Sequence, residues 1–145
     1  MKTDYSFKRI LVGVENSEDA LKAFHYAVHR AKLEKSSLTL ALVLEDEDIN
    51  TYEILDKDFL KAARDNLAKQ AEDYRQYALD QGVKTVDILI SQGNPGEVIV
   101  KEFIPASNAD LLIIGAKSRS RIRHYFGTQA SYMAKNAEIA VLVYR

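Results

Sequence analysis

The chain has 145 residues, of which 47% are apolar and 28% charged, a composition typical of a folded globular domain rather than of a disordered segment. Its formal net charge of -1 argues against a general affinity for nucleic acid or for acidic membrane surfaces. The absence of cysteine excludes disulfides, thiol chemistry and zinc held by cysteine.

The first third of the chain predicts a helix between two strands. Residues 10–14 are a short apolar run typical of a strand, and residues 16–19 combine capping residues with an acidic first turn. A second apolar run at residues 38–44 predicts the next strand. The helix between them has one apolar stripe, formed by Ala20, Leu21, Phe24, Ala27, Val28 and Ala31.

The middle of the chain repeats this pattern after a polar, acidic stretch at residues 45–50. A long helix is predicted to end at Gln81-Gly82, because glycine is favoured just after a helix. Residues 86–90 alternate apolar and polar side chains, which predicts a strand with one wet face at a sheet edge. Apolar residues of the long helix recur at three and four positions: Leu60, Ala63, Leu67, Ala71, Tyr74 and Ala78.

A third helix is predicted to begin near residue 95. Asn94 can cap it, Pro95 suits its first position, and Glu97 can return the capping bond. Pro105 is expected to end this helix early, because proline donates no backbone hydrogen bond.

The last third predicts two more strands around a final helix. Residues 111–114 form an unbroken apolar strand, and residues 117–124 form a basic loop. Gly127-Thr128 is expected to open the helix, and residues 139–144 are expected to form the last strand. Strands that alternate with helices predict an α/β fold with a mainly parallel sheet covered on both faces.

No internal boundary or repeat is apparent, so residues 1–145 are expected to form a single domain. No apolar run approaches the ~20 residues that span a bilayer. Residues 1–8 are polar and lack an apolar signal region. These features lead us to expect a cytoplasmic protein with no membrane partner.

Two segments of this fold are candidates for a ligand site, because open parallel sheets bind ligands where the order of winding reverses. They are the turn at residues 13–17 and the loop at residues 115–128. The helix start at Gly127-Thr128 favours phosphate through its amide groups and its dipole. Cations nearby, Lys117, Arg119, Arg121 and Arg123, favour a polyphosphate. The alternative interpretation of the loop at residues 115–128 is a connecting turn with a solvated basic face and no ligand.

Four segments, in order, are similar to those of one known family. Residues 7–17 resemble its opening, an Ile-Leu-Val run followed by Pro or Ala, an aliphatic residue, Asp, one further residue and Ser. Residues 109–115, 127–130 and 139–143 resemble its fourth strand, the start of its last helix and its final strand. This is the universal stress protein family. The resemblance implies a three-layer α/β/α fold, a five-stranded parallel sheet of order 3-2-1-4-5, and a homodimer through the C-terminal strand.

The resemblance also implies a nucleotide site. Some members bind ATP through Gly, two residues, Gly, nine residues, then Gly and Ser or Thr. Here Ser118 replaces the second glycine, eight residues separate it from Gly127, and Glu15 stands where the family's adenine-contacting Asp would be. These departures predict weak binding. By position, the site comprises Gly13, Glu15 and Val43 around the base, Ile114, Gly115, Lys117 and Ser118 towards the phosphates, and Gly127, Thr128, Gln129 and Ala130 at the phosphates.

The function that this resemblance implies is a regulatory module that binds ATP or a related nucleotide weakly, with or without Mg²⁺. The alternative is a dimeric stress-response interaction protein that has lost nucleotide binding, and a third reading is a slow ATPase. The sequence contains no Walker loop, HxGH motif, cysteine nucleophile or Gly-x-Ser-x-Gly elbow. We therefore assign no catalytic residue.

Other groups of residues that could suggest a function are interpreted as structural. His25 and His29 have a spacing that can hold a metal, but a solvated helix face is favoured and no metal site is assigned. The acidic residues 45–48 are read as a solvated loop rather than a Mg²⁺ site. The basic run at residues 119–123 is too short to predict RNA binding. Tyr74, Tyr77 and Tyr132 are read as core or interface residues rather than as stacking platforms.

Overall fold

Five parallel strands form one sheet with the order β3-β2-β1-β4-β5. The computed structural model describes residues 4–45, 56–116 and 127–145. The α/β class and the strand order predicted above are both confirmed, and the strand with one wet face lies at a sheet edge as expected. The strands are β1 (Arg9–Gly13), β2 (Ser37–Glu45), β3 (Val86–Gly93), β4 (Leu111–Gly115) and β5 (Ala140–Tyr144).

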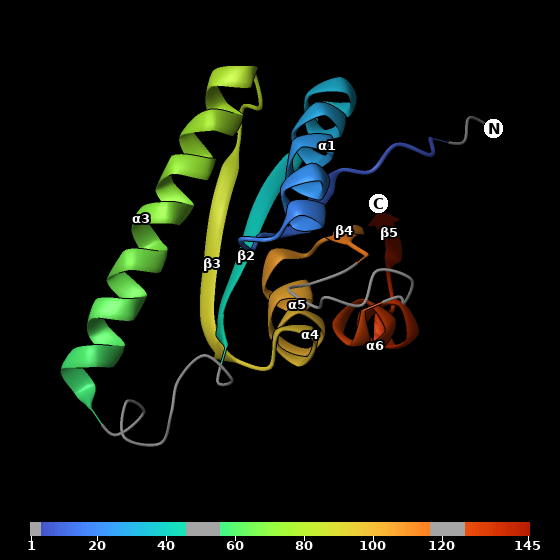
Figure 1. The fold of residues 1–145 in the computed structure, drawn as a ribbon. Helices are drawn as coiled ribbons and strands as arrows, with labels where there is room; N and C mark the ends of the chain where they lie inside the picture. The colour runs from blue at the N-terminus through green and yellow to red at the C-terminus, as the bar shows by residue number, and fades with distance from the viewer. Residues whose placement is uncertain (1–3, 46–55, 117–126) are drawn as a thin grey trace.

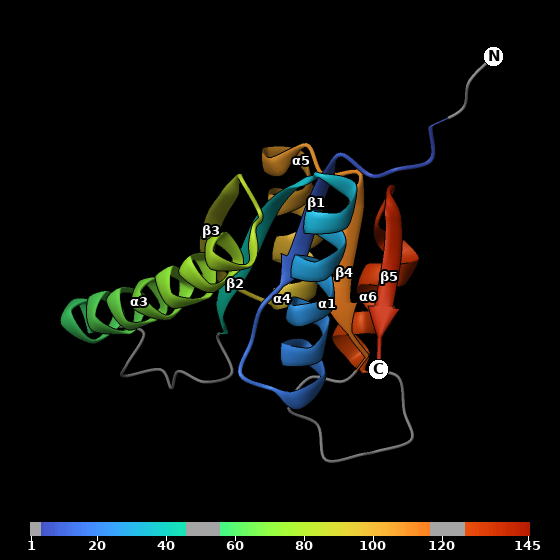
Figure 2. The same cartoon turned by 90° about the horizontal axis from the view of Figure 1, so that it is seen from above.

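Helices cover both faces of the sheet and give the molecule three layers (Figure 1, Figure 2). One face carries the two longest helices, and the other face carries the shorter helical segments, which run from β3 to β4 and from β4 to β5. This arrangement follows from right-handed crossovers that run in opposite directions from β1. The helical segments are α1 (Glu18–Glu34), α3 (Lys57–Gln81), α4 (Pro95–Val98), η2 (Ile99–Phe103), α5 (Ile104–Ser107) and α6 (Thr128–Asn136).

The strands in the middle of the sheet are buried on both faces. In β1, Ile10 and Val12 belong to the core beneath α1 and α3, whereas Leu11 belongs to the core beneath α4 and α6. All three are at most 1% exposed. Successive side chains of a strand point to opposite faces, so an unbroken apolar run fills both cores at once.

The predicted helix starts and stops use the expected capping residues. The Ser17 side chain accepts a hydrogen bond from the Ala20 amide at the start of α1. The Asn94 side chain accepts one from the Glu97 amide at the start of α4. Gly82 follows α3 with φ of 110°, a conformation that glycine adopts without strain. These local signals fix where the chain turns back towards the sheet.

Pro105 does not end the third helix, so that prediction was wrong. Helical backbone continues from α4 through η2 and α5 to Ser107. Segment η2 is a π-helix, and the Ile104 amide donates to the Ile99 carbonyl, five residues earlier. A proline ring clashes with the carbonyl four residues before it in a regular α-helix. The wider turn just before Pro105 accounts for its accommodation here.

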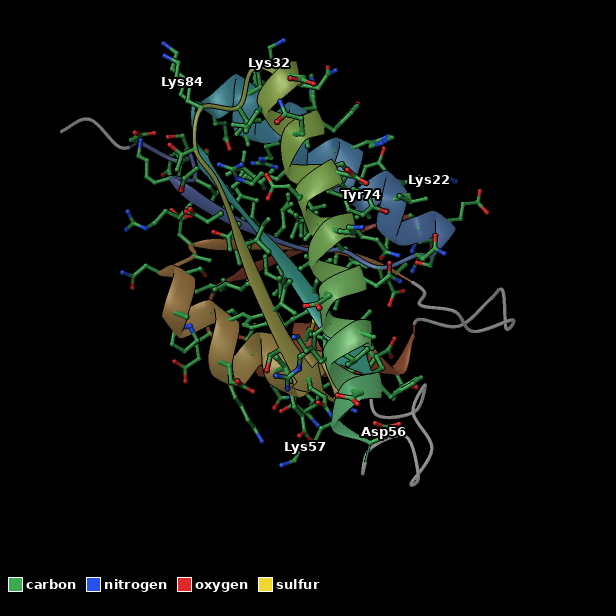
Figure 3. All side chains as sticks on the ribbon, turned by 90° about the vertical axis from the view of Figure 1, so that its left-hand side faces the viewer. Lys22, Lys32, Asp56, Lys57, Tyr74 and Lys84 are labelled. Atoms are coloured by element: carbon green, nitrogen blue, oxygen red, sulfur yellow. The ribbon has the colours of Figure 1, made fainter. Side chains whose placement is uncertain are left out.

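Helix α3 is long but polar, and Ala71 and Ala78 are its buried residues. Figure 3 shows the helix from outside, with Asp56 and Lys57 at its start and Tyr74 midway along it. Its inner face carries small or half-exposed side chains, so it covers the sheet loosely. Among the helices that the structure describes, none combines the length and the apolar character needed to cross a bilayer.

Candidate functional site

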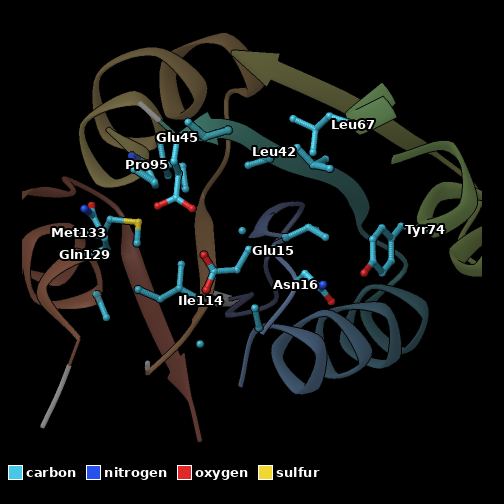
Figure 4. Close-up of a pocket in the computed structure, with 18 of the residues that line it drawn as sticks. Glu15, Asn16, Leu42, Glu45, Leu67, Tyr74, Pro95, Ile114, Gln129 and Met133 are labelled. Atoms are coloured by element: carbon cyan, nitrogen blue, oxygen red, sulfur yellow. The ribbon is translucent and has the colours of Figure 1, made fainter. Parts of the chain in front are cut away.

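A cleft opens at the carboxyl ends of the strands, where the order of winding reverses between β1 and β4 (Figure 4). It contains about 890 Å³ of free space, counted with its open mouth. Its walls come from the turn after β1, the ends of β2 and β4, helix α3 on one face and helices α4 and α6 on the other. The cleft therefore lies where ligands of this class of sheet bind.

Seven of the predicted site residues line this cleft: Gly13, Glu15, Val43, Ile114, Gly115, Gln129 and Ala130. Gly127 and Thr128 stand at the start of α6 but are not among its lining residues. Lys117 and Ser118 lie outside the described residues. The structure thus brings together the residues predicted around a base and part of those predicted near phosphates.

Glu15 is placed by the pairing of β1 with β2. The Val14 amide donates to the Ala41 carbonyl at 2.9 Å, which extends the strand pairing one residue beyond β1 and leaves Glu15 at the cleft. Figure 4 shows the carboxylates of Glu15 and Glu45 both directed into the cleft. Two carboxylates favour N–H donors of a ligand and oppose a phosphate placed beside them.

Gly115 ends β4, and its φ is not in the left-handed region. The first turn of α1 lies against it. A Cβ atom on Gly115 would lie 2.8 Å from the Ala20 nitrogen and 2.8 Å from the Asp19 carbonyl carbon. The absence of a side chain lets α1 begin directly beside the end of β4.

Gln129 connects the two helices that close one side of the cleft. Its side-chain oxygen accepts a hydrogen bond of 2.8 Å from the Gly96 amide, which ties α6 to the start of α4. A Cβ atom on Gly96 would lie 2.6 Å from that oxygen. Gln129 is therefore held in position before any ligand arrives. At the start of the same helix, the Gly127 amide donates to the Ala116 carbonyl at 2.8 Å, so this amide is used within the fold.

Sequence reasoning missed the contribution of α3 to the cleft. Leu67, Gln70 and Tyr74 all line it, and their spacing of three and four residues puts them on one face of the helix. Leu67 and Tyr74 were predicted as parts of an apolar stripe, which indicates the buried face but not a ligand site. Val14 and Asn16 also line it, and they lie in the turn at residues 13–17 that was predicted as a candidate segment. Further lining residues not predicted are Ala20, Ala41, Leu42, Glu45, Pro95, Ile99 and Met133.

The two histidines with metal-binding spacing lie away from this cleft. His25 stacks on Tyr77, with ring centroids 5.2 Å apart. Within residues 4–45, 56–116 and 127–145 there is no group of three or more His, Asp or Glu side chains that could hold a metal ion.

Comparison with known proteins gives one consistent result. The model of the universal stress protein family matches residues 6–145. A Staphylococcus epidermidis protein, provisionally named a universal stress protein, is 29% identical over 141 residues, which cover 97% of this chain and 85% of that protein.

Solved structures with the same fold extend the comparison. The universal stress protein UspA from Lactobacillus plantarum has a TM-score of 0.85 and 26% identity, and the match covers 98% of this chain and 100% of that one. A universal stress protein in complex with cAMP has a TM-score of 0.68 and 22% identity, over 97% and 98% of the two chains. A universal stress protein from Archaeoglobus fulgidus in complex with dAMP has a TM-score of 0.66 and 19% identity, over 97% and 99%.

Proposed function

Because the chain belongs to the universal stress protein family, we propose that it is a regulatory module that binds an adenine nucleotide in the cleft at the end of its sheet. The observation that carries this proposal is the convergence of seven residues, expected from the resemblance, on one cleft. The complexes of two similar folds with cAMP and with dAMP support an adenine nucleotide as the ligand here.

The cleft suggests an orientation for the nucleotide. The base is proposed to lie beside Glu15 and Val43, where the Glu15 carboxylate accepts a hydrogen bond from the exocyclic amine of adenine. The phosphates are proposed to lie towards the first turn of α6, near Gln129 and Ala130. The carboxylate of Glu45 faces the same space.

Removing the Glu15 carboxylate is expected to weaken AMP binding by about 10-fold to 100-fold, because a hydrogen bond to a charged group contributes about 1.5–3 kcal/mol. Isothermal titration calorimetry of the Glu15→Ala variant with AMP measures this. Asp87→Ala removes an exposed carboxylate from β3, away from the cleft, and is the matched control. GMP, which has a carbonyl group in place of the amine, is expected to bind wild-type protein more weakly than AMP.

An absence of binding heat with AMP, ATP and ATP with Mg²⁺ would contradict the proposal. It would favour the alternative, a dimeric interaction protein without a nucleotide. Phosphate release from ATP that disappears when the cleft is altered would indicate the slow ATPase instead.

We also propose that two copies associate through β5. This strand pairs with β4 on one side and has no neighbour on its other side among the described strands. Val141 and Val143 are half-buried there and pack against the core beneath α4 and α6. An apolar edge strand with unpaired backbone groups is prone to pair with another chain. Pairing with the same strand of a second copy, across a two-fold axis, gives these backbone groups hydrogen-bond partners.

Placing a charge on this edge is expected to convert a dimer into a monomer. Light scattering of the wild-type protein should give twice the chain mass of 16.4 kDa, and Val143→Glu should give a single chain mass. Leu89→Glu, on the opposite edge strand and against the same core, is the control and should remain dimeric. A wild-type protein that is monomeric at all concentrations would exclude this interface.

A further inference from the structure

The cleft continues past Glu15 into a second compartment on the other face of the sheet. We call it the apolar lobe and define it by Val14, Asn16, Leu42, Leu67, Gln70 and Tyr74. Figure 4 shows Leu42, Leu67 and Tyr74 on one side of Glu15, and Pro95, Gln129 and Met133 on the other. The lobe is continuous with the proposed nucleotide site but is not filled by the parts of a nucleotide placed above.

The lobe exists because α1 and α3 diverge towards their N-terminal ends (Figure 1). Near their C-terminal ends the two helices touch, since the Lys32 side chain lies within 3.4 Å of the Cβ position of Gly82. They still touch at Phe24 and Tyr74, whose ring centroids are 4.9 Å apart. Leu67 lies two turns before Tyr74, nearer the N-terminal end of α3, and it lines the cleft together with Ala20 of α1.

The walls of the lobe are apolar and already in position. Its floor is Leu42, which is 2% exposed, and its side walls are Leu67 and Tyr74, both half-buried. The Tyr74 ring is fixed edge-on against Phe24, with an interplanar angle of 69°. Such a preformed apolar wall favours an apolar or aromatic group and requires little reorganisation when it binds.

The polar side chains around the lobe limit where on a ligand an apolar or aromatic group can be attached. Glu15 lies between the two compartments, and its carboxylate accepts N–H donors. An exocyclic amine that carries one substituent keeps one N–H, which can still bind Glu15. The substituent can then extend past Glu15 towards Leu67 and Tyr74. Asn16 and Gln70, both exposed, supply amide groups at the rim.

We propose that the apolar lobe binds an apolar or aromatic group carried on the exocyclic amine of the bound adenine. The ligand class is therefore an N6-substituted adenine nucleotide rather than AMP itself. This inference rests on the proposed nucleotide site and adds a second, apolar point of recognition to it. The same protein then discriminates between two nucleotides that differ in a part remote from the phosphates.

Calorimetry with the full chain tests the proposal by comparing AMP with N6-benzyl-AMP. Wild-type protein is expected to bind the benzyl derivative about tenfold more tightly, because the ring is buried against Leu67 and Tyr74. Leu67→Gln is expected to remove most of this preference while leaving the affinity for AMP within about twofold. Leu60→Gln replaces another half-buried leucine of α3, outside the cleft, and should keep the preference.

The outcomes separate this inference from the proposed function. If AMP binds but N6-benzyl-AMP binds no more tightly, the lobe proposal is overturned and the nucleotide site stands. If the preference survives in Leu67→Gln, the benzyl group is bound elsewhere and the lobe proposal is again overturned. If neither ligand binds, both proposals fail together.

Discussion

Replacing Gly115 with alanine is expected to lower the free energy of unfolding by about 3 kcal/mol, at the upper end of the cost of overpacking. The new Cβ atom would lie 2.8 Å from the Ala20 nitrogen, 2.8 Å from the Asp19 carbonyl carbon and 3.0 Å from the Asp19 oxygen. All three are backbone atoms, so no side-chain rotation relieves the contact. The first turn of α1 must move away from β4 as a unit.

That turn is not free to move without loss elsewhere. The Ser17 side chain accepts a hydrogen bond from Ala20, and the buried side chains of Ala20, Ala23 and Phe24 anchor the helix on the sheet. A shift of the turn would weaken this capping bond and the packing of these side chains together. The expected destabilisation therefore exceeds the cost of a single misplaced methyl group.

Gly13→Ala is the matched control for this prediction, because Gly13 ends β1 as Gly115 ends β4. A Cβ atom on Gly13 meets the side chains of Ile114 and Ile99 at 3.6 Å, which is ordinary van der Waals contact. Its effect is expected to stay within about 1 kcal/mol in either direction. Urea denaturation measures both variants, and equal stabilities would show that α1 does not approach β4 as closely as described.

The burial of the strands and the starts of the helices follow from features that a sequence displays directly. The unbroken apolar run at residues 111–114 requires burial on both faces, whereas the alternation at residues 86–90 suits an edge. Ser17 and Asn94 mark helix starts by hydrogen bonds that reach three residues along the chain. The resemblance to the family added the order 3-2-1-4-5, which alternation alone leaves open.

The turn at residues 13–17 was predictable as a site because parallel strands bring their carboxyl ends to one edge of the sheet. Gly13 and Glu15 reach the cleft for this reason, whereas Ile114 was named by the resemblance to the family. The contribution of Leu67 and Tyr74 was not predictable in the same way. Helical spacing shows which face of α3 points inward, but not where the helix leaves the sheet and exposes that face to a cavity.

Contacts between distant segments explain the remaining differences. The hydrogen bond between Gln129 and Gly96 joins residues 33 positions apart, and no local sequence pattern predicts it. The need for glycine at position 115 arises from the backbone of Asp19 and Ala20, almost one hundred residues earlier. The continuation of helical backbone through Pro105 depends on a π turn that residues 99–103 do not signal.

Replacing Phe24 with alanine is expected to lower the free energy of unfolding by about 4 kcal/mol, the usual cost of removing a fully buried aromatic ring. Phe24 is 1% exposed and is among the largest fully buried side chains of the core. Its ring contacts Tyr74 at 4.9 Å and Tyr77 at 5.7 Å between centroids. Urea denaturation followed by circular dichroism measures the loss.

Tyr77→Ala supplies the control, because Tyr77 touches the same ring but is 39% exposed. Its expected effect is below about 1.5 kcal/mol, since much of its surface stays in water when the protein folds. If Phe24→Ala and Tyr77→Ala lower the free energy of unfolding by similar amounts, the result would contradict the full burial of Phe24. Phe24→Leu retains most of the apolar volume and is expected to fall between them, at about 2 kcal/mol.

The milder Phe24→Leu variant also links the core to the cleft. Phe24 holds the Tyr74 ring edge-on, and Tyr74 is a wall of the apolar lobe. A leucine leaves that ring less firmly oriented, so the preference for N6-benzyl-AMP is expected to fall while AMP binding beside Glu15 changes little. If both affinities fall equally, the variant has disturbed the whole cleft rather than the lobe. A selective fall would mean that a residue outside the cleft sets the shape of one of its two compartments.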